Sequence, residues 1–207
     1  METLESVYKA LAGKYSDNED LIDSIWIEIK TRHSTSSHHY HNLSHLKHLY
    51  EELQVIKGEL EDWDVVLYTL FFHDIVYNAR STKNEEKSAE MASDLLYRLG
   101  VPKHQINRCT AQILDTKGHN LSEDGDSNYF TDADLAILGQ SWDRYQSYLE
   151  QIRREYKMFP DLLYKPGRKK VLKHFLSMDR IYKTSHFYEK YEQVARDNLQ
   201  QELTLLT

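Results

Sequence analysis

The sequence is poor in the residues that build tight turns and covalent cross-links. Its 207 residues include only 7 Gly, 3 Pro and a single cysteine, Cys109. Sandwiches and barrels need many tight turns, so this scarcity favours long helices with few connections. One cysteine cannot form an intramolecular disulfide, which favours a reducing compartment. The composition therefore predicts an all-α protein located in the cytoplasm.

Two further shortages limit the partners that we expect. No stretch approaches the roughly 20 apolar residues of a membrane span, and residues 1–15 lack the apolar core of a signal peptide. The formal net charge is -7, whereas a nucleic-acid polymer recruits basic surfaces. We therefore expect no membrane and no nucleic-acid partner. A small anionic substrate is compatible, because one metal ion can outweigh the overall field. The sequence does not indicate an oligomeric state.

The hydrophobic periodicity indicates one helical domain over residues 1–207. Residues 63–77 are apolar nearly all round, which predicts a central buried helix. Asn84 is expected to cap the next helix, residues 118–128 to form an exposed loop, and residues 165–170 to be a solvated charge run. The remaining expected helices cover approximately residues 4–11, 18–30, 42–57, 84–100, 103–116, 132–138, 142–158, 167–183 and 186–204.

Histidine is abundant, and it gathers near one predicted helix start. Six of the 11 histidines fall between His33 and His48. His73 and Asp74 end the apolar run of residues 63–77, where a carboxylate is costly to bury unless it is paired or binds a metal. His45 precedes His73 by 28 residues, which allows one helix, a turn and an antiparallel return that brings the two together.

A fourth candidate ligand lies further along the chain. Asp134 stands in the apolar segment TDADLAILG, with Asp132 as its rival and a plain helix cap as the alternative for Asp132. His41 is the rival of His45, because residues four apart share a helix face. Two imidazoles and two carboxylates suit Mn, Fe, Co, Ni or Zn, with Mg as a further candidate, and leave positions for water and substrate.

The order H…HD…D on consecutive helices resembles the HD superfamily of metal-dependent phosphohydrolases, and in particular a bacterial group of predicted HD phosphohydrolases. The resemblance implies an HD-domain helical bundle with extra C-terminal helices, with His45, His73, Asp74 and Asp134 as metal ligands. His38 stands where the resemblance leads us to expect Arg. The segments that carry the resemblance are YHNLSHL (40–46), FFHDIVYN (71–78), NEEKSAE (84–90), ILDTKGH (113–119), DADLAILG (132–139), IRREY (152–156) and RIYKT (180–184).

Each of the further candidate residues has a functional and a purely structural interpretation. Asp74 and Glu85 are the expected catalytic residues, although Glu85 could equally be a first-turn acid that complements its helix dipole. The basic side chains near the site could be ordinary solvated charges, or they could bind an anionic substrate. The candidate substrate-binding residues are His41, Arg80, Lys83, His119 and Arg154.

The expected function is metal-dependent hydrolysis of a phosphoester or phosphoanhydride bond in a small phosphorylated metabolite, with a nucleotide favoured. One alternative is an HD-fold di-iron oxygenase, in which His104 or His119 would supply additional ligands. A second is a non-catalytic nucleotide-binding module that uses the same pocket without turnover.

Overall fold

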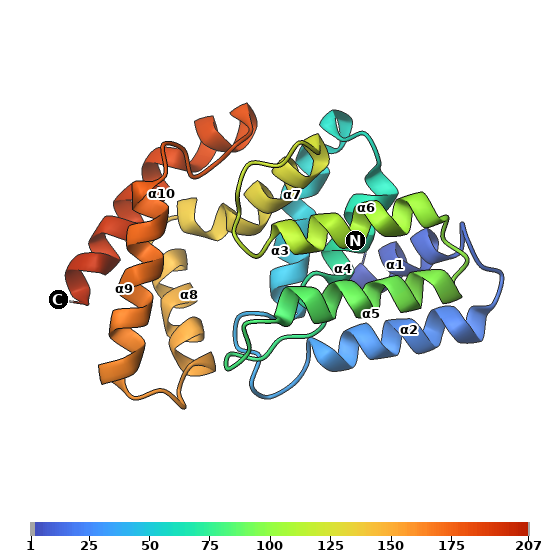
Figure 1. Ribbon diagram of the computed structural model, residues 1–207, viewed down its shortest axis with the longest axis horizontal. Helices are drawn as coiled ribbons and strands as arrows, with labels where there is room; N and C mark the ends of the chain where they lie inside the picture. Colours follow the sequence, from blue (N-terminus) through green and yellow to red (C-terminus); the bar gives the residue numbers. More distant parts are fainter. Residues whose placement is uncertain (1–2, 207) are drawn as a thin grey trace. The chain divides into compact units, whose positions relative to one another are not determined.

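A computed structural model describes residues 3–206, and this range is helical with no strand (Figure 1). The all-α prediction is therefore confirmed. The chain divides into two compact units, unit 1 (Met1–Phe130) and unit 2 (Thr131–Thr207). The single domain over residues 1–207 stays a prediction. Over the described residues, every helix is too short or too polar to traverse a bilayer.

Unit 1 is built around α4 (Trp63–Phe72), which packs against four other helices of the unit. Every residue from Val65 to Phe72 is buried, which confirms the predicted central helix. Burial of a side chain such as Phe71, which is 0% exposed, contributes about 1.5–3 kcal/mol to stability. The other elements are α1 (Leu4–Ala12), α2 (Glu19–Arg32), α3 (Leu43–Val55), η1 (Lys57–Glu59), α5 (Asn84–Arg98), α6 (Lys103–Asp115) and the start of α7 (Gly125–Asp134).

The central helix ends earlier than the predicted limit at residue 77. Its last residue is Phe72, and the segment that follows turns towards α5. There the Ser88 side chain takes the place of helical hydrogen bonds to Val76. The Ser88 hydroxyl accepts a hydrogen bond from the Val76 N–H and donates one to the Val76 carbonyl. Asn84 is the first residue of α5 and not its cap, because its side chain is bonded to the backbone of Asn78.

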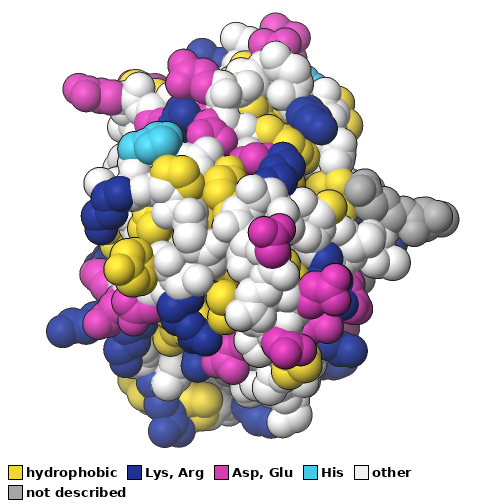
Figure 2. Space-filling view, turned by 90° about the vertical axis from the view of Figure 1, so that its right-hand side faces the viewer, with side chains coloured by type: hydrophobic (Ala, Val, Ile, Leu, Met, Phe, Trp, Pro, Cys, Tyr) yellow, Lys and Arg dark blue, Asp and Glu magenta, His cyan; other side chains and the backbone are white. Residues whose placement is uncertain are grey.

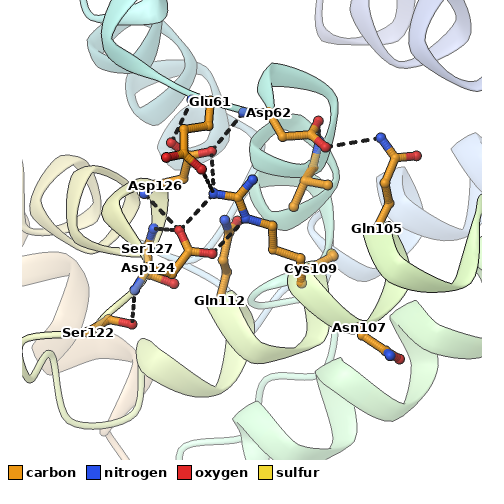
Figure 3. A network of polar contacts seen from close by, with 12 residues as sticks. Glu61, Asp62, Gln105, Asn107, Cys109, Gln112, Ser122, Asp124, Asp126 and Ser127 are labelled. Atoms are coloured by element: carbon orange, nitrogen blue, oxygen red, sulfur yellow. Dashed lines mark hydrogen bonds and ion pairs between the residues drawn. The ribbon is translucent and has the colours of Figure 1, made fainter.

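Residues 118–128 do not form the long exposed loop that their polarity predicted. Helix α7 begins at Gly125, and the Asp126 carboxylate is 1% exposed. Its oxygens accept the backbone N–H groups of Glu61 and Asp62, each at 2.9 Å (Figure 3). The Arg108 guanidinium lies 2.7 Å from Asp124 and 3.2 Å from Asp126. This network holds the segment against the start of α4.

Helix α6 runs in the same direction as α4. Gln105 donates to Asp62 at the beginning of α4, and about two turns later on both helices the Thr69 hydroxyl donates to Gln112 at 2.7 Å. The last turn of α6 and residues 116–119 therefore lie at the end of α4 that carries His73. His104, at the start of α6, lies at the opposite end. Ten residues of helix separate these ends by about 15 Å.

Unit 2 contains η2 (Leu135–Gly139), α8 (Trp142–Glu155), α9 (Asp161–Ser177) and α10 (Ser185–Leu205). η2 packs against α8 and α10. Gly139 is required there, because a Cβ atom at this position would lie 2.4 Å from the Tyr191 Cβ. The Asn198 amide donates to the carbonyls of Leu138 and Gln140 and fixes η2 on α10.

The charged segment 165–170 is part of a helix and is not uniformly solvated. α9 begins at Asp161, six residues before its predicted start, and continues through Pro166. Arg168 is 9% exposed and pairs with the buried Glu202 at 2.7 Å, and the Tyr145 hydroxyl donates to the same carboxylate. An internal proline costs about 3 kcal/mol in a helix, and α9 also packs against α10, the helix that carries Glu202.

Candidate metal centre

The end of α4 presents the His73 ring in a fixed orientation. His73 is the C-cap residue of α4, and it is 1% exposed. Its Nδ1 lies 3.0 Å from the Leu70 carbonyl oxygen. Because a carbonyl only accepts, Nδ1 carries the proton in this bond, and Nε2 of the neutral ring has its lone pair available. A metal ligand requires this form of histidine.

Three ligand atoms converge at this point. His45 Nε2 lies 3.3 Å from His73 Nε2, and Asp74 Oδ2 lies 3.2 Å from His73 Nε2. All three residues offer a ligand atom within 4.8 Å of the others. An ion with ligand bonds of about 2.0–2.2 Å, at angles between 90° and the tetrahedral value, separates neighbouring ligand atoms by roughly 2.8–3.6 Å. The two measured distances match this spacing, so the buried group of His45, His73 and Asp74 is able to bind a metal ion.

The antiparallel arrangement expected for the two histidine-bearing helices is present. His45 lies in the first turn of α3, which Asn42 caps, and His73 follows the last turn of α4. α3 packs against α4. The expectation that His41 shares a helix face with His45 is wrong, because His41 precedes the Asn42 cap. His41 instead approaches from the loop, and its Nε2 lies 4.0 Å from Asp74 Oδ2.

Asp74 is held as a carboxylate. Burial raises the pKa of Asp74, but its electrostatic interactions with the neighbouring histidine rings, His73 first and then His41, together lower it by more. The net pKa is well below the usual value of an aspartate. An ionised carboxylate beside two imidazoles is a donor set suited to a divalent transition metal.

In unit 2, the structure separates the roles of Asp132 and Asp134. Asp132 is fully buried, and both of its oxygens accept hydrogen bonds from Lys183 and Thr184. Thr184 is the N-cap of α10, so Asp132 braces the start of that distant helix and is not a cap of its own helix. Asp134 is the last residue of α7 and is partly exposed. Its role as a ligand stays a prediction.

Three candidate residues follow Asp74 in the chain. Arg80 and Lys83 lie in the segment between α4 and α5, and both are exposed. Glu85 lies in the first turn of α5 and is partly exposed. This placement is compatible with the dipole role and with the catalytic role of Glu85. The substrate-binding roles of Arg80 and Lys83 stay predictions.

The remaining two candidates lie in different units. His119 follows α6, at the end of α4 that carries His73, and has a positive φ of 48°. A non-glycine residue in this left-handed region is uncommon, and such strain is often found at functional sites. Arg154 lies on α8 in unit 2, is 64% exposed and is 3.9 Å from Glu150. Its substrate-binding role stays a prediction.

Aromatic residues around the histidines were not singled out from the sequence. The Tyr77 ring stacks on His41 with centroids 3.9 Å apart, and the Tyr40 ring lies 4.9 Å from that of His45. His38 Nε2 lies 3.3 Å from the Tyr77 carbonyl oxygen. Tyr77 follows Asp74 by three residues and Tyr40 precedes His41. Both tyrosines belong to the motifs YHNLSHL and FFHDIVYN, so their position beside the histidines could have been predicted from these motifs.

Comparison with known protein families, with curated proteins and with solved structures finds no match to this chain.

Proposed function

We propose that the protein is a metal-dependent hydrolase that cleaves a phosphoester or phosphoanhydride bond in a small phosphorylated molecule, with a nucleotide as the favoured substrate. The observation that carries the proposal is the convergence of His45 Nε2, His73 Nε2 and an Asp74 oxygen at distances that suit one ion. A bound divalent ion would polarise a phosphoryl oxygen and activate water. Mn, Fe, Co, Ni, Zn and Mg are the candidate ions.

The donor set supports an open centre and not a closed structural site. Structural zinc sites are usually closed by four protein ligands rich in cysteine, whereas unit 1 assembles two histidines and one aspartate. Further positions therefore accept solvent or substrate oxygen. In this proposal Asp134 supplies one more carboxylate, as the resemblance to HD phosphohydrolases implies.

The proposal assigns a role to each of the further candidate residues. Glu85 handles the proton of the attacking water or the leaving group, and the basic residues compensate the charge of the phosphate. On the face shown in Figure 2, basic side chains are interspersed with acidic ones, so recognition of an anion needs specific cations close to the metal. The residues assigned to the phosphate are His41, Arg80, Lys83, His119 and Arg154.

A substrate panel tests this proposal. Purified protein is stripped with a chelator, reloaded separately with Mn²⁺, Co²⁺ or Zn²⁺, and assayed for phosphate and pyrophosphate release from nucleotides and other phosphorylated metabolites. We expect release that depends on the metal and is lost in Asp74→Ala. Glu85→Gln should lower kcat while metal content stays at the wild-type level. The exposed Glu86→Gln, one residue further along the same helix turn, is the matched control.

Other outcomes of the panel favour other functions. Metal and nucleotide binding without release of phosphate or pyrophosphate across the panel would contradict hydrolysis and support a binding module. Oxygen consumption with iron-loaded protein would instead support an oxygenase. His104, one of the two extra ligands considered for an oxygenase, lies at the end of α4 opposite His73.

A further inference from the structure

One part of unit 2 exposes large apolar side chains that its core does not use. Leu162 and Leu163 lie in the first turn of α9 and are 84% and 62% exposed, and Met158 in the preceding turn is exposed as well. Single exposed apolar side chains are ordinary, whereas neighbouring ones indicate a contact surface. The α8–α9 turn and the start of α9 are therefore a candidate contact surface.

Hydrogen bonds from α8 hold the turn that presents these leucines. The Arg153 guanidinium donates to the carbonyls of Tyr156 and Phe159 at 3.0 and 3.2 Å. It also pairs with Asp161 at 2.7 Å and lies over the Tyr164 ring, 4.7 Å from the centroid. α8 and α9 thus form an antiparallel pair with the turn at one end (Figure 1). The leucines are exposed on a turn that is fixed by specific contacts.

The same part of the chain is strongly basic, although the net charge of the protein is -7. The only acid in residues 157–173 is Asp161, and Arg153 balances its charge. Within the described part of the chain, none of the lysines of this segment has a carboxylate partner. Their positive charge is therefore available to an anionic partner. These lysines are Lys157, Lys165, Lys169, Lys170 and Lys173.

Leucines and lysines share the outer face of α9. Positions seven or eleven residues apart in a helix point in directions that differ by about 20°. Lys173 therefore lies in line with Leu162, and Lys170 lies in line with Leu163. The opposite side of α9 carries the buried Leu172, and the helix packs against α10. The outer face is thus apolar at its beginning and basic along its length.

These residue types favour a lipid surface over a protein or a nucleic acid. Lysine is depleted in protein interfaces, where arginine and aromatic residues are enriched, and Arg168 is engaged with the buried Glu202. Sites for single-stranded nucleic acid present aromatic rings to the bases, whereas the most exposed apolar side chains here are leucines. Leucine beside lysine is typical of surfaces that lie in the headgroup region of a bilayer.

We propose that the α8–α9 turn and the outer face of α9 bind the surface of an anionic lipid bilayer. Leu162 and Leu163 insert at the boundary of the acyl chains, and the lysines contact the lipid phosphates. Such binding needs no spanning helix, and it departs from the sequence-based expectation that the protein has no membrane partner. The inference does not depend on the metal centre.

Co-sedimentation of the full chain with vesicles tests this inference. One set of vesicles contains one part phosphatidylserine to two parts phosphatidylcholine, and the other contains phosphatidylcholine alone. Polyglutamate serves as a soluble anionic probe. The first variant combines Leu162→Ser with Leu163→Ser, and the second combines Lys165→Gln, Lys170→Gln and Lys173→Gln. All five side chains are exposed, so both variants should fold, which circular dichroism checks.

A control variant carries the same kinds of change in unit 1. It combines Leu121→Ser with Lys87→Gln and Lys103→Gln, three side chains that are also exposed. It therefore loses two positive charges and one exposed leucine away from α9. A general effect of charge or surface hydrophobicity would appear in this variant as well.

We expect wild-type protein to bind the vesicles that contain phosphatidylserine and not those of phosphatidylcholine alone. The leucine variant and the lysine variant should each lower the partition coefficient at least tenfold, because each lysine near an anionic surface contributes about a fivefold factor and the leucines supply the buried apolar area. The control should change it less than twofold. Added salt should weaken binding of wild type, since it screens the lysines.

Three results would overturn the inference. The first is an absence of wild-type binding to the anionic vesicles, and the second is an equal loss of binding in the control. The third is binding that depends on the lysines and not on the leucines, which would show adsorption without insertion. Polyglutamate binding that is lost in the lysine variant, without any vesicle binding, would point instead to an acidic protein segment as the partner.

Discussion

Replacing Asp132 by Asn tests whether the fully buried aspartate of unit 2 is structural. The carboxylate accepts the backbone N–H of Lys183 at 2.9 Å and that of Thr184 at 2.7 Å. It also accepts the Thr184 hydroxyl at 2.8 Å and lies 3.2 Å from the Lys183 ammonium. Asparagine has the same shape, but it retains one acceptor oxygen and places an NH₂ group against these donors.

The expected loss in the free energy of unfolding follows from the hydrogen bonds that the asparagine amide cannot form. At least two hydrogen bonds to a charged acceptor are lost, each contributing about 1.5–3 kcal/mol. The Lys183 side chain, 6% exposed, also loses its counter-charge. Removing one partner of a buried ion pair typically costs about 3–5 kcal/mol, which agrees with this sum. We therefore expect Asp132→Asn to lower the free energy of unfolding by about 3–5 kcal/mol.

Urea denaturation followed by far-UV circular dichroism measures this change, and elemental analysis measures the metal content of the same samples. Asp134→Asn is the matched variant, two residues away. We expect Asp132→Asn to lose stability and keep its metal, and Asp134→Asn to lose metal affinity with a smaller change in metal-free stability. A loss below about 1 kcal/mol in Asp132→Asn, together with loss of metal, would refute this division of roles.

Three further predictions concern the scaffold. Arg108→Met should lower the free energy of unfolding by about 2–4 kcal/mol in denaturant titration, because the buried Asp126 loses its cation; an unchanged midpoint would contradict the network. Burial raises the pKa of Cys109 to about 12, so thiol reagents should modify this cysteine only when the protein unfolds, and rapid labelling of native protein would contradict its burial. The free energy of unfolding should fall as pH rises above about 8.5, because the thiol ionises there in the unfolded chain but not in the folded one. Gly139→Ala should lower the Tm, because the new Cβ meets Tyr191 at 2.4 Å, and a wild-type Tm would show that η2 moves freely.

Much of the fold follows from local patterns in the sequence. The all-round apolar run of α4 predicted the central helix, and Asn18 and Asn42 cap α2 and α3 as their residue types favour. The end of α4 could not be read in the same way. It depends on Ser88, a residue of the next helix, whose hydroxyl forms hydrogen bonds with both the N–H and the carbonyl of Val76.

Two segments that were predicted to be solvated are partly buried for the same reason. In both, charged side chains form ion pairs with residues that lie far away in the sequence. Polar composition made residues 118–128 resemble an exposed loop, but Arg108 and the N–H groups at the start of α4 bind its acids. A proline and four basic residues made 165–170 resemble a solvated helix start, but Arg168 pairs with Glu202, which lies 34 residues away. Neither partner is visible in a window of sequence.

The candidate site shows the same division between local and distant information. The spacing of His45 and His73 predicted their encounter, and the structure brings their Nε2 atoms to 3.3 Å. The choice between His41 and His45 depended on where α3 begins, and Asn42 decides it.

The metal stoichiometry of unit 1 ligand variants tests the central claim most directly. Wild-type protein, His73→Ala, Asp74→Ala and the control His104→Leu are stripped of metal, dialysed against Co²⁺ and analysed for bound metal per chain. The account predicts about one ion per chain in wild type and in His104→Leu, and almost none in the two ligand variants. Wild-type metal content in both His73→Ala and Asp74→Ala, or none in wild type, would contradict the claim that these residues hold a metal ion.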